Sequence, residues 1–178
     1  MYALIFTALI LFTVLISLPY RRDIQNAYSR LDSIERQVVE TGGGPIEVAI
    51  RGEGEPVLVS HGIGGGFDQG LGLVDAYLGD GYKVIAPSRF GYHATPLPAN
   101  ATPASQADAF VCLLDSLHIE KVTVMANSAG GTSALQMAIR HPERIHALVL
   151  VSTAAPTVGT DITLPPKPVI QTVFGSDF

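Results

Sequence analysis

The chain has 178 residues, 47% of them hydrophobic, and a formal net charge of −5 at pH 7. A mildly negative chain lacks the basic surface through which proteins bind phosphate backbones, so the charge excludes a nucleic-acid partner. Its one cysteine, Cys112, excludes a disulfide within the chain and a cysteine-rich metal site. We expect no metal ion in this protein.

The N-terminal segment is uncharged and ends at a pair of arginines. Residues 2–18 form an apolar run, and a membrane-spanning helix needs about 17–25 residues. The run lacks the positive start and the A-x-A-like site of a secretory signal. Arg21 and Arg22 follow it directly, and positive residues favour the cytoplasmic side. We predict that residues 1–20 are a single-pass membrane anchor with the following domain in the cytoplasm.

Residues 21–39 have apolar side chains at helical spacing. Their charges fall on one face, and the other face carries a stripe made up of Ile24, Tyr28, Leu31, Ile34 and Val38. An amphipathic helix beside an anchor lies against lipid or against the next domain. We therefore expect a juxtamembrane helix over 21–39 and a folded domain from residue 40.

Four short apolar runs alternate with helical patterns in the rest of the chain. They are residues 57–59, the run within "GYKVIAPSRFGY", residues 122–125 and the run within "IHALVLVSTAAP". Strands that alternate with helices form a mostly parallel sheet covered on both faces, and functional groups collect at the carboxyl ends of its strands. The predicted fold class is α/β with a doubly wound sheet.

One serine stands where a predicted strand turns into a predicted helix. Ser128 follows the run that ends at Met125, with Ala126 two residues before it and Gly130 two after it. Small neighbours are needed where strand and helix backbones nearly touch. Two interpretations are open at this point. Ser128 is either an N-cap, which accepts a hydrogen bond from the first helical turn, or a nucleophile raised above the sheet.

A glycine-rich loop, "HGIGGG" at residues 61–66, follows the first of the four runs. Glycine adopts positive φ without steric cost, so such a loop bends close to a bound molecule. Phe67 stands where a dinucleotide fingerprint needs glycine or alanine, and the chain has no Gly-Lys-Ser/Thr. Alone, the loop is equally typical of a turn before a helix, which we expect over residues 70–78. No cofactor is indicated.

With these motifs in place, residues 40 to 156 resemble the α/β-hydrolase family, and in particular membrane-associated bacterial members that share "PYRRD" and "APSRFGY". The serine segment is similar to the G-x-S-x-G elbow, with Ala126 replacing the first glycine, and "HGIGG" is similar to the oxyanion loop. Ser88 departs from the aspartate that many relatives carry there. Elbow and loop together favour Ser128 as the nucleophile.

The resemblance implies acyl transfer from a small-molecule ester to water. A serine needs a histidine to take its proton and a carboxylate to orient that histidine. The oxyanion would be bound by the backbone N–H groups of Ile63 and Ala129. The substrate-pocket candidates are His61, Gly62, Gly64, Arg89 and His93. Among these, His61 is expected to orient the loop rather than act as the base.

The base itself is not found in the expected place. In this family the acid and then the histidine follow the serine, and only His141 and His146 follow Ser128. One ends the serine helix and the other begins the next strand, so each lies roughly 20 Å from the serine. His93 lies on the correct edge of the sheet but precedes Ser128.

We therefore expect a fold truncated before its last strands, without its catalytic acid and histidine, and an inactive chain. Residues 40–156 would form the N-terminal part of the hydrolase domain and 157–178 the start of a cap. The leading function is a membrane-tethered serine hydrolase. The alternatives are an acyltransferase or cofactor-free peroxidase on the same fold, or a non-catalytic membrane-bound binding homologue. No pattern names the ester or indicates an oligomeric state.

Overall fold

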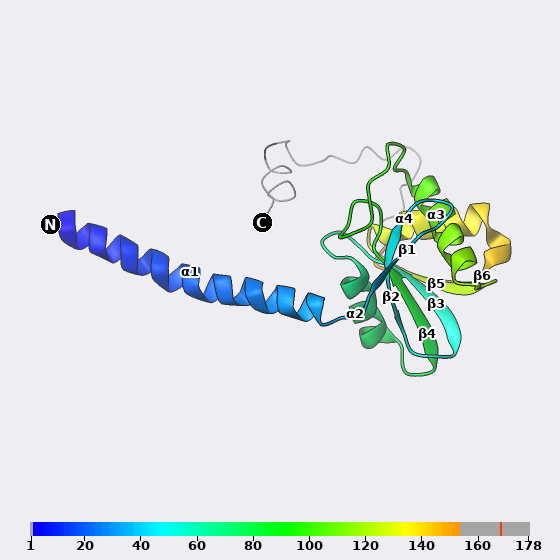
Figure 1. Ribbon diagram of the computed structural model, residues 1–178, viewed down its shortest axis with the longest axis horizontal. Helices are drawn as coiled ribbons and strands as arrows, with labels where there is room; N and C mark the ends of the chain where they lie inside the picture. The colour runs from blue at the N-terminus through cyan, green and yellow to red at the C-terminus, as the bar shows by residue number, and fades with distance from the viewer. Residues whose placement is uncertain (1, 154–167, 169–178) are drawn as a thin grey trace.

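The computed structural model describes residues 2–153 and 168 of the chain. A six-stranded sheet, with helices on both faces, carries a long N-terminal helix that extends away from it (Figure 1). The strand order is β1-β2-β4-β3-β5-β6. In chain order the elements are α1 (Tyr2–Asp32), β1 (Gln37–Val39), β2 (Ile46–Arg51), β3 (Glu55–Ser60), α2 (Phe67–Tyr77), β4 (Tyr82–Pro87), α3 (Pro103–Ser116), β5 (Val122–Asn127), α4 (Gly130–Arg140), the 3-10 turn η1 (Pro142–Arg144) and β6 (Ile145–Val151).

The four predicted runs form the parallel part of the sheet. β3 pairs in parallel with β4 and β5, and β5 pairs in parallel with β6. Successive side chains of a strand point to opposite faces, and in β3 Leu58 joins one apolar cluster while Val57 and Val59 join the other. α3 and α4 pack on the first cluster and α2 on the second. Because both faces are buried, these strands are apolar throughout.

Two further strands, β1 and β2, were not predicted from the sequence. β2 pairs antiparallel with β4, and β1 pairs antiparallel with β2, so both extend the sheet at one side. β2 has a charged residue, Glu47, inside an otherwise apolar stretch, which is atypical of a buried strand, yet Glu47 is only 5% exposed. The helix expected over 70–78 also begins earlier, at Phe67.

The helix expected over 21–39 is wrong in its bounds. It is continuous with the preceding segment as α1 and ends at Asp32, and Val38 lies in β1 instead of on a helical stripe. Helix ends leave carbonyl groups without partners. Here Arg36 Nη1 donates to the carbonyls of Leu31 (2.9 Å) and Ile34 (3.3 Å), which closes the end of α1.

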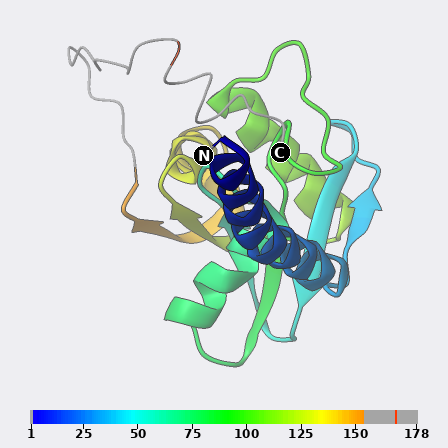
Figure 2. The ribbon, with the colours of Figure 1, turned by 90° about the vertical axis from the view of Figure 1, so that its left-hand side faces the viewer.

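Within the described part of the chain, α1 is one helix that is long and apolar enough to cross a membrane by length and composition. An N-terminal helix of this kind is either an anchor or a signal sequence. Seen from the α1 side, the helix projects from the domain toward the viewer (Figure 2). The predicted start of a cap at 157–178 lies outside the described residues, apart from residue 168, and so do residues 154–156.

Candidate active site

Ser128 lies in a tight turn between the end of β5 and the start of α4. Its φ of +48° is in the left-handed region, where a non-glycine residue carries a strain of about 1–3 kcal/mol. The Ser128 N–H donates to Val151 O at 3.1 Å, and Ser128 O accepts from the Gly131 N–H at 3.2 Å. Neighbours on both sides therefore hold the strained turn, as in a nucleophile elbow.

The N-cap interpretation of Ser128 is excluded. The N-cap of α4 is Ala129, and no side chain caps this helix. The Ser128 side chain is half-buried, and its hydroxyl makes no hydrogen bond to any residue that the structure describes. A hydroxyl that the fold does not use is available for chemistry.

The glycine after the elbow is required by close packing. A Cβ on Gly130 would overlap the main-chain carbonyl of Ser60 and lie 2.5 Å from the carbonyl oxygen of His61. Ala126, in contrast, is fully buried in the core with its methyl group accommodated. The alanine that replaces the first glycine of the motif therefore leaves the turn intact.

The glycine-rich loop touches the elbow. A Cβ on Gly62 would lie 3.1 Å from Ser128 Cβ. Gln69 of α2 holds the loop from behind, since its Oε1 accepts from the Gly62 N–H (2.6 Å) and its Nε2 donates to Ile63 O (3.4 Å). Within residues 2–153, no acceptor is found for the N–H groups of Ile63 and Ala129. The two predicted oxyanion donors thus come from segments in contact and are not used by the fold.

His61 fixes this loop and is occupied at both ring nitrogens. Its Nε2 accepts from the Arg89 N–H (2.9 Å), so the ring proton is assigned to Nδ1, which donates to Gly62 O (2.8 Å). Burial disfavours the charged ring and lowers the pKa of His61 to about 4. The ring is therefore neutral at pH 7 and is not available as a general base.

Arg89 holds the same carbonyl from another direction. Its Nη2 donates to Gly62 O at 3.0 Å, and its guanidinium lies 5.2 Å from the centre of the Tyr92 ring. Burial lowers the pKa of Arg89, although the group stays charged at neutral pH. Gly62 O therefore accepts two hydrogen bonds that together fix the carbonyl beside the elbow.

The histidines that follow Ser128 lie away from it. His141, at the end of α4, places its Nε2 2.7 Å from Asp108 Oδ1. His146 is the second residue of β6, whose first residue pairs with Val122 at the start of β5. Ser128 follows the other end of β5, about 17 Å further at the rise of a strand. Neither histidine reaches the Ser128 hydroxyl.

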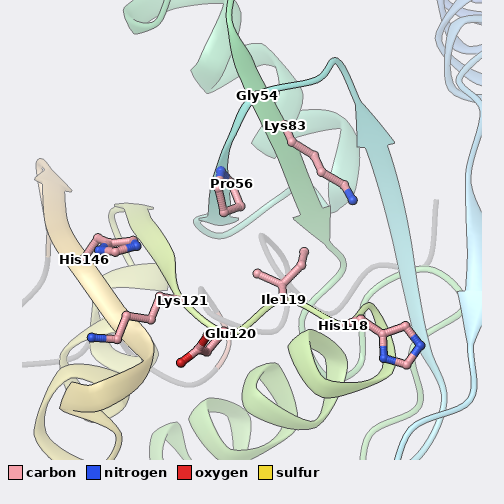
Figure 3. A pocket seen from close by; sticks show the side chains of 8 residues that line it. All are labelled: Gly54, Pro56, Lys83, His118, Ile119, Glu120, Lys121 and His146. Atoms are coloured by element: carbon pink, nitrogen blue, oxygen red, sulfur yellow. The ribbon is translucent and has the colours of Figure 1, made fainter.

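The amino ends of the strands form a separate cavity of about 400 Å³ (Figure 3). Its lining residues are Gly54, Pro56, Lys83, His118, Ile119, Glu120, Lys121 and His146. Figure 3 shows Lys83 and Lys121 pointing away from one another, so their charges do not converge on one ligand. This cavity is at the edge of the sheet opposite to Ser128, where His118 and His146 are remote from the elbow.

His93 and Gly64 line a different cavity, of about 430 Å³, between the glycine-rich loop and α1. The helix contributes Ile24, Ala27, Tyr28, Arg30 and Leu31, and Ile34, just after its end, also lines the cavity. His93 Nε2 lies 3.5 Å from Asp68 Oδ1, and its ring packs on Phe67. The five pocket candidates thus divide into two groups: His61, Gly62 and Arg89 support the loop, whereas Gly64 and His93 face α1.

A buried carboxylate that the sequence did not single out links these segments. Glu47 Oε2 accepts from Ser88 Oγ (2.9 Å) and from the Ala94 N–H (3.3 Å), and its Oε1 pairs with Arg36 Nε (3.3 Å). Ser88 Oγ in turn accepts from the Phe67 N–H (3.3 Å). A serine donates to Glu47, whereas an ionised aspartate at position 88 would repel it. Serine at position 88, where many relatives have aspartate, is therefore compatible with the buried carboxylate of Glu47.

Comparison with known proteins agrees with this geometry. The alpha/beta hydrolase fold family matches residues 55–174, more than half of the chain. "Uncharacterized hydrolase YcgS" of Bacillus subtilis (strain 168) is 38% identical over 116 residues, 65% of this chain and 40% of that protein. A 2-hydroxymuconate semialdehyde hydrolase of Pseudomonas sp. (strain CF600) is 36% identical over 135 residues, 72% of this chain and 47% of that protein. A solved alpha/beta hydrolase fold protein from Nakamurella multipartita is 36% identical with a TM-score of 0.67, covering 77% of this chain and 47% of its own.

The chain therefore belongs to the α/β-hydrolase family, and the fold predicted from its sequence is confirmed. It spans less than half the length of these relatives. Gln69 and Glu47 position the loop and its surroundings, and neither was predicted from the sequence. Both look like ordinary surface residues until the fold brings their partners to them.

Proposed function

We propose that the protein is a serine hydrolase that cleaves small-molecule esters, with Ser128 as the nucleophile. The observation that carries this proposal is the strained φ of +48° at Ser128, whose hydroxyl is unused by the described residues. Strain held by the surrounding structure marks functional positions. The relatives described above are named hydrolases, which favours hydrolysis over transfer to another acceptor or peroxidase chemistry.

In this mechanism, Ser128 Oγ attacks the ester carbonyl carbon while a histidine takes its proton. The carbonyl oxygen becomes an oxyanion that accepts hydrogen bonds from the N–H groups of Ile63 and Ala129. Each donor of this kind contributes about 10²–10³-fold to kcat in serine hydrolases. The alcohol leaves with the proton from the histidine, and Ser128 keeps the acyl group. The histidine then takes a proton from water, whose oxygen attacks the acyl carbon, and the acid is released as Ser128 Oγ regains its proton.

We further propose that the catalytic histidine and its carboxylate are not among these 178 residues. His61 is occupied at both ring nitrogens, His93 packs on Phe67 beside Asp68 and faces α1, and the other three histidines, His118, His141 and His146, lie away from the elbow. The relatives are more than twice as long as the matched segment, and the family's chain order puts both residues after the serine. The 178-residue chain is then expected to hydrolyse esters at most about 10³–10⁴-fold faster than water does.

The proposed location is a membrane, through α1 as a single-pass anchor with the domain in the cytoplasm. Apolar side chains of α1 are exposed, and two arginines follow the apolar run. Reporter fusions after Arg36 and N-terminal mass analysis test this location. A mature protein that begins near Tyr20, or a reporter active only outside the cytoplasm, would contradict it.

The nucleophile is tested by labelling the whole protein with an active-site-directed phosphonate. The wild type should be labelled and Ser128→Ala should not, because the substitution removes the attacking oxygen. Ser152→Ala is a matched control, since Ser152 follows the neighbouring strand with a similar φ of +45° and is exposed. Equal labelling of wild type and Ser128→Ala, or loss of label in Ser152→Ala alone, would refute the assignment.

A further inference from the structure

A third cavity, of about 200 Å³, lies behind Arg89 and next to the first turn of α3. Its lining residues are Arg89, Phe90, Leu97, Ala101, Thr102, Pro103, Gln106, Thr132 and Ser133. Two buried donor atoms, Arg89 Nε and Gln106 Nε2, have no hydrogen-bond partner among the described residues, and both residues line this cavity. A buried donor without an acceptor costs about 1–3 kcal/mol, so two beside one cavity call for a ligand that accepts.

The orientation of the Gln106 amide follows from its other contact. Gln106 is only 5% exposed, and its Oε1 accepts from the Phe90 N–H at 2.7 Å. The oxygen end is therefore fixed, and Nε2 retains two hydrogens to donate. Neither hydroxyl beside it accepts these hydrogens: Ser133 Oγ and Thr132 Oγ1 donate to the carbonyls of Gly130 and Ala129, and Gln106 Nε2 has no partner among the described residues.

Positive charge dominates the same cavity. The Arg89 guanidinium forms no ion pair with a carboxylate of the described residues, and no acidic residue lines the cavity. Thr102 and Pro103 form the start of α3, and a helix N-terminus carries a partial positive charge. A half-buried guanidinium without a counter-ion, beside a helix N-terminus, favours an anionic oxygen ligand.

We propose that this cavity binds a small carboxylate through Arg89 Nε and Gln106 Nε2. A planar carboxylate accepts two hydrogen bonds and neutralises the guanidinium. Phe90 and Leu97 cover the adjoining alkyl carbon, and the exposed residues Leu97, Ala101 and Thr102 leave the mouth open to solvent. Arg89 also donates to Gly62 O, so the same side chain contacts both the bound carboxylate and the glycine-rich loop.

Succinate is the probe, added to the whole protein in detergent micelles against chloride at equal ionic strength. At about a hundred times its dissociation constant it should raise the Tm by about 5–10 °C, because it binds only the folded state. Isothermal titration calorimetry of the unsubstituted protein should detect the same binding. Equal effects of succinate and chloride, or no heat of binding, would overturn the proposal.

The diagnostic variant is Gln106→Glu. It keeps the acceptor for the Phe90 N–H but replaces Nε2 with a carboxylate oxygen, which puts a negative charge beside the cavity that Arg89 also lines. Its Tm without succinate should equal or exceed that of the wild type, and its affinity for succinate should fall at least about tenfold. Gln25→Glu makes the same charge change at an exposed position of α1 and should leave binding unchanged. Unchanged affinity in Gln106→Glu refutes the site, and the calorimetry decides it even if this variant does not fold.

The carboxylate belongs either to the substrate or to a separate effector, and labelling of Ser128 separates these sources. This arm rests on the proposed function. A substrate carboxylate predicts that succinate slows labelling by a carboxylate-bearing phosphonate but not by a neutral one. An effector predicts that succinate changes both rates equally or neither. If no phosphonate labels Ser128, the proposed function fails, while the succinate-dependent Tm still decides the subsite.

Discussion

The buried carboxylate of Glu47 offers the sharpest test of how the segments around the site are held together. Its two oxygens accept from Ser88 and Ala94 and pair with Arg36, and the residue is 5% exposed. Glu47→Gln keeps the size but turns one acceptor oxygen into a donor. That donor meets either Arg36 or the Ser88 and Ala94 donors, so at least one charge-assisted hydrogen bond is lost.

The expected loss of stability is about 2–4 kcal/mol. A hydrogen bond to a charged group contributes about 1.5–3 kcal/mol, and breaking a fully buried ion pair costs about 3–5 kcal/mol. The second figure is an upper bound, because the Arg36 side chain is 29% exposed and keeps Asp32 and the carbonyls of Leu31 and Ile34 as partners. For a chain of this size the Tm should fall by roughly 5–15 °C.

Unfolding of the whole chain in micelles, followed by circular dichroism, measures this loss. Glu53→Gln is the control, because it removes the same charge from an exposed residue and should change stability by at most about 0.5 kcal/mol. If Glu47→Gln and Glu53→Gln are equally stable, the carboxylate does not hold these segments together and the reasoning fails.

Two further predictions concern the elbow and the loop. Gly130→Ala should prevent folding or lower stability by at least about 2 kcal/mol, because its Cβ would overlap the Ser60 carbonyl. Gly72→Ala, in open space on α2, should instead stabilise the protein by about 0.5–1 kcal/mol. Equal effects of the two substitutions in a denaturant titration would contradict the packing argument. The pKa of His61 in the folded protein is about 4, below its ordinary value of 6.5, so between pH 4 and 6.5 the unfolded chain binds more protons than the folded one. The free energy of unfolding should therefore rise with pH across that window, by an amount on the order of 3 kcal/mol. His61→Gln should flatten the rise when unfolding is measured from pH 4 to 7, and an unchanged slope would show that His61 is not its source.

The fold could be predicted from the sequence wherever an element has a clear local pattern of apolar residues. Strands buried on both faces are runs of apolar residues, so β3, β4, β5 and β6 could be predicted from local sequence. β1 has three residues and β2 contains the buried Glu47, so neither shows the apolar pattern of its neighbours. We expected the folded domain to begin at residue 40, but Leu31 and Ile34 already pack against its core. α1 ends between these two residues.

The candidate site likewise has residues that local sequence predicts and residues that it does not. The strand-to-helix pattern around Ser128 is local, and it predicts the turn that the structure shows. Gln69, Glu47 and Gln106 are different, because each depends on a partner brought close by the fold. Glu47 and Ser88, for example, are 41 residues apart, and nothing in either neighbourhood indicates that they form a hydrogen bond. The supporting contacts of a site are therefore harder to predict than its nucleophile.

The outer strand β6 leads to a last prediction, that the 178-residue chain associates with itself. In the part of the chain that the structure describes, β6 ends the sheet, and its Val149 and Leu150 are 41% and 42% exposed. An apolar edge strand offers unpaired N–H and C=O groups to another chain, and a lysine on such an edge blocks that pairing. Leu150→Lys should therefore shift the chain in micelles toward the monomer in sedimentation velocity. Ile139→Lys removes a more exposed apolar residue, at 70%, from the helix α4, where no strand edge is present, and should change little. An equal shift in both variants would mean that exposed apolar surface in general, and not the edge of the sheet, drives the association.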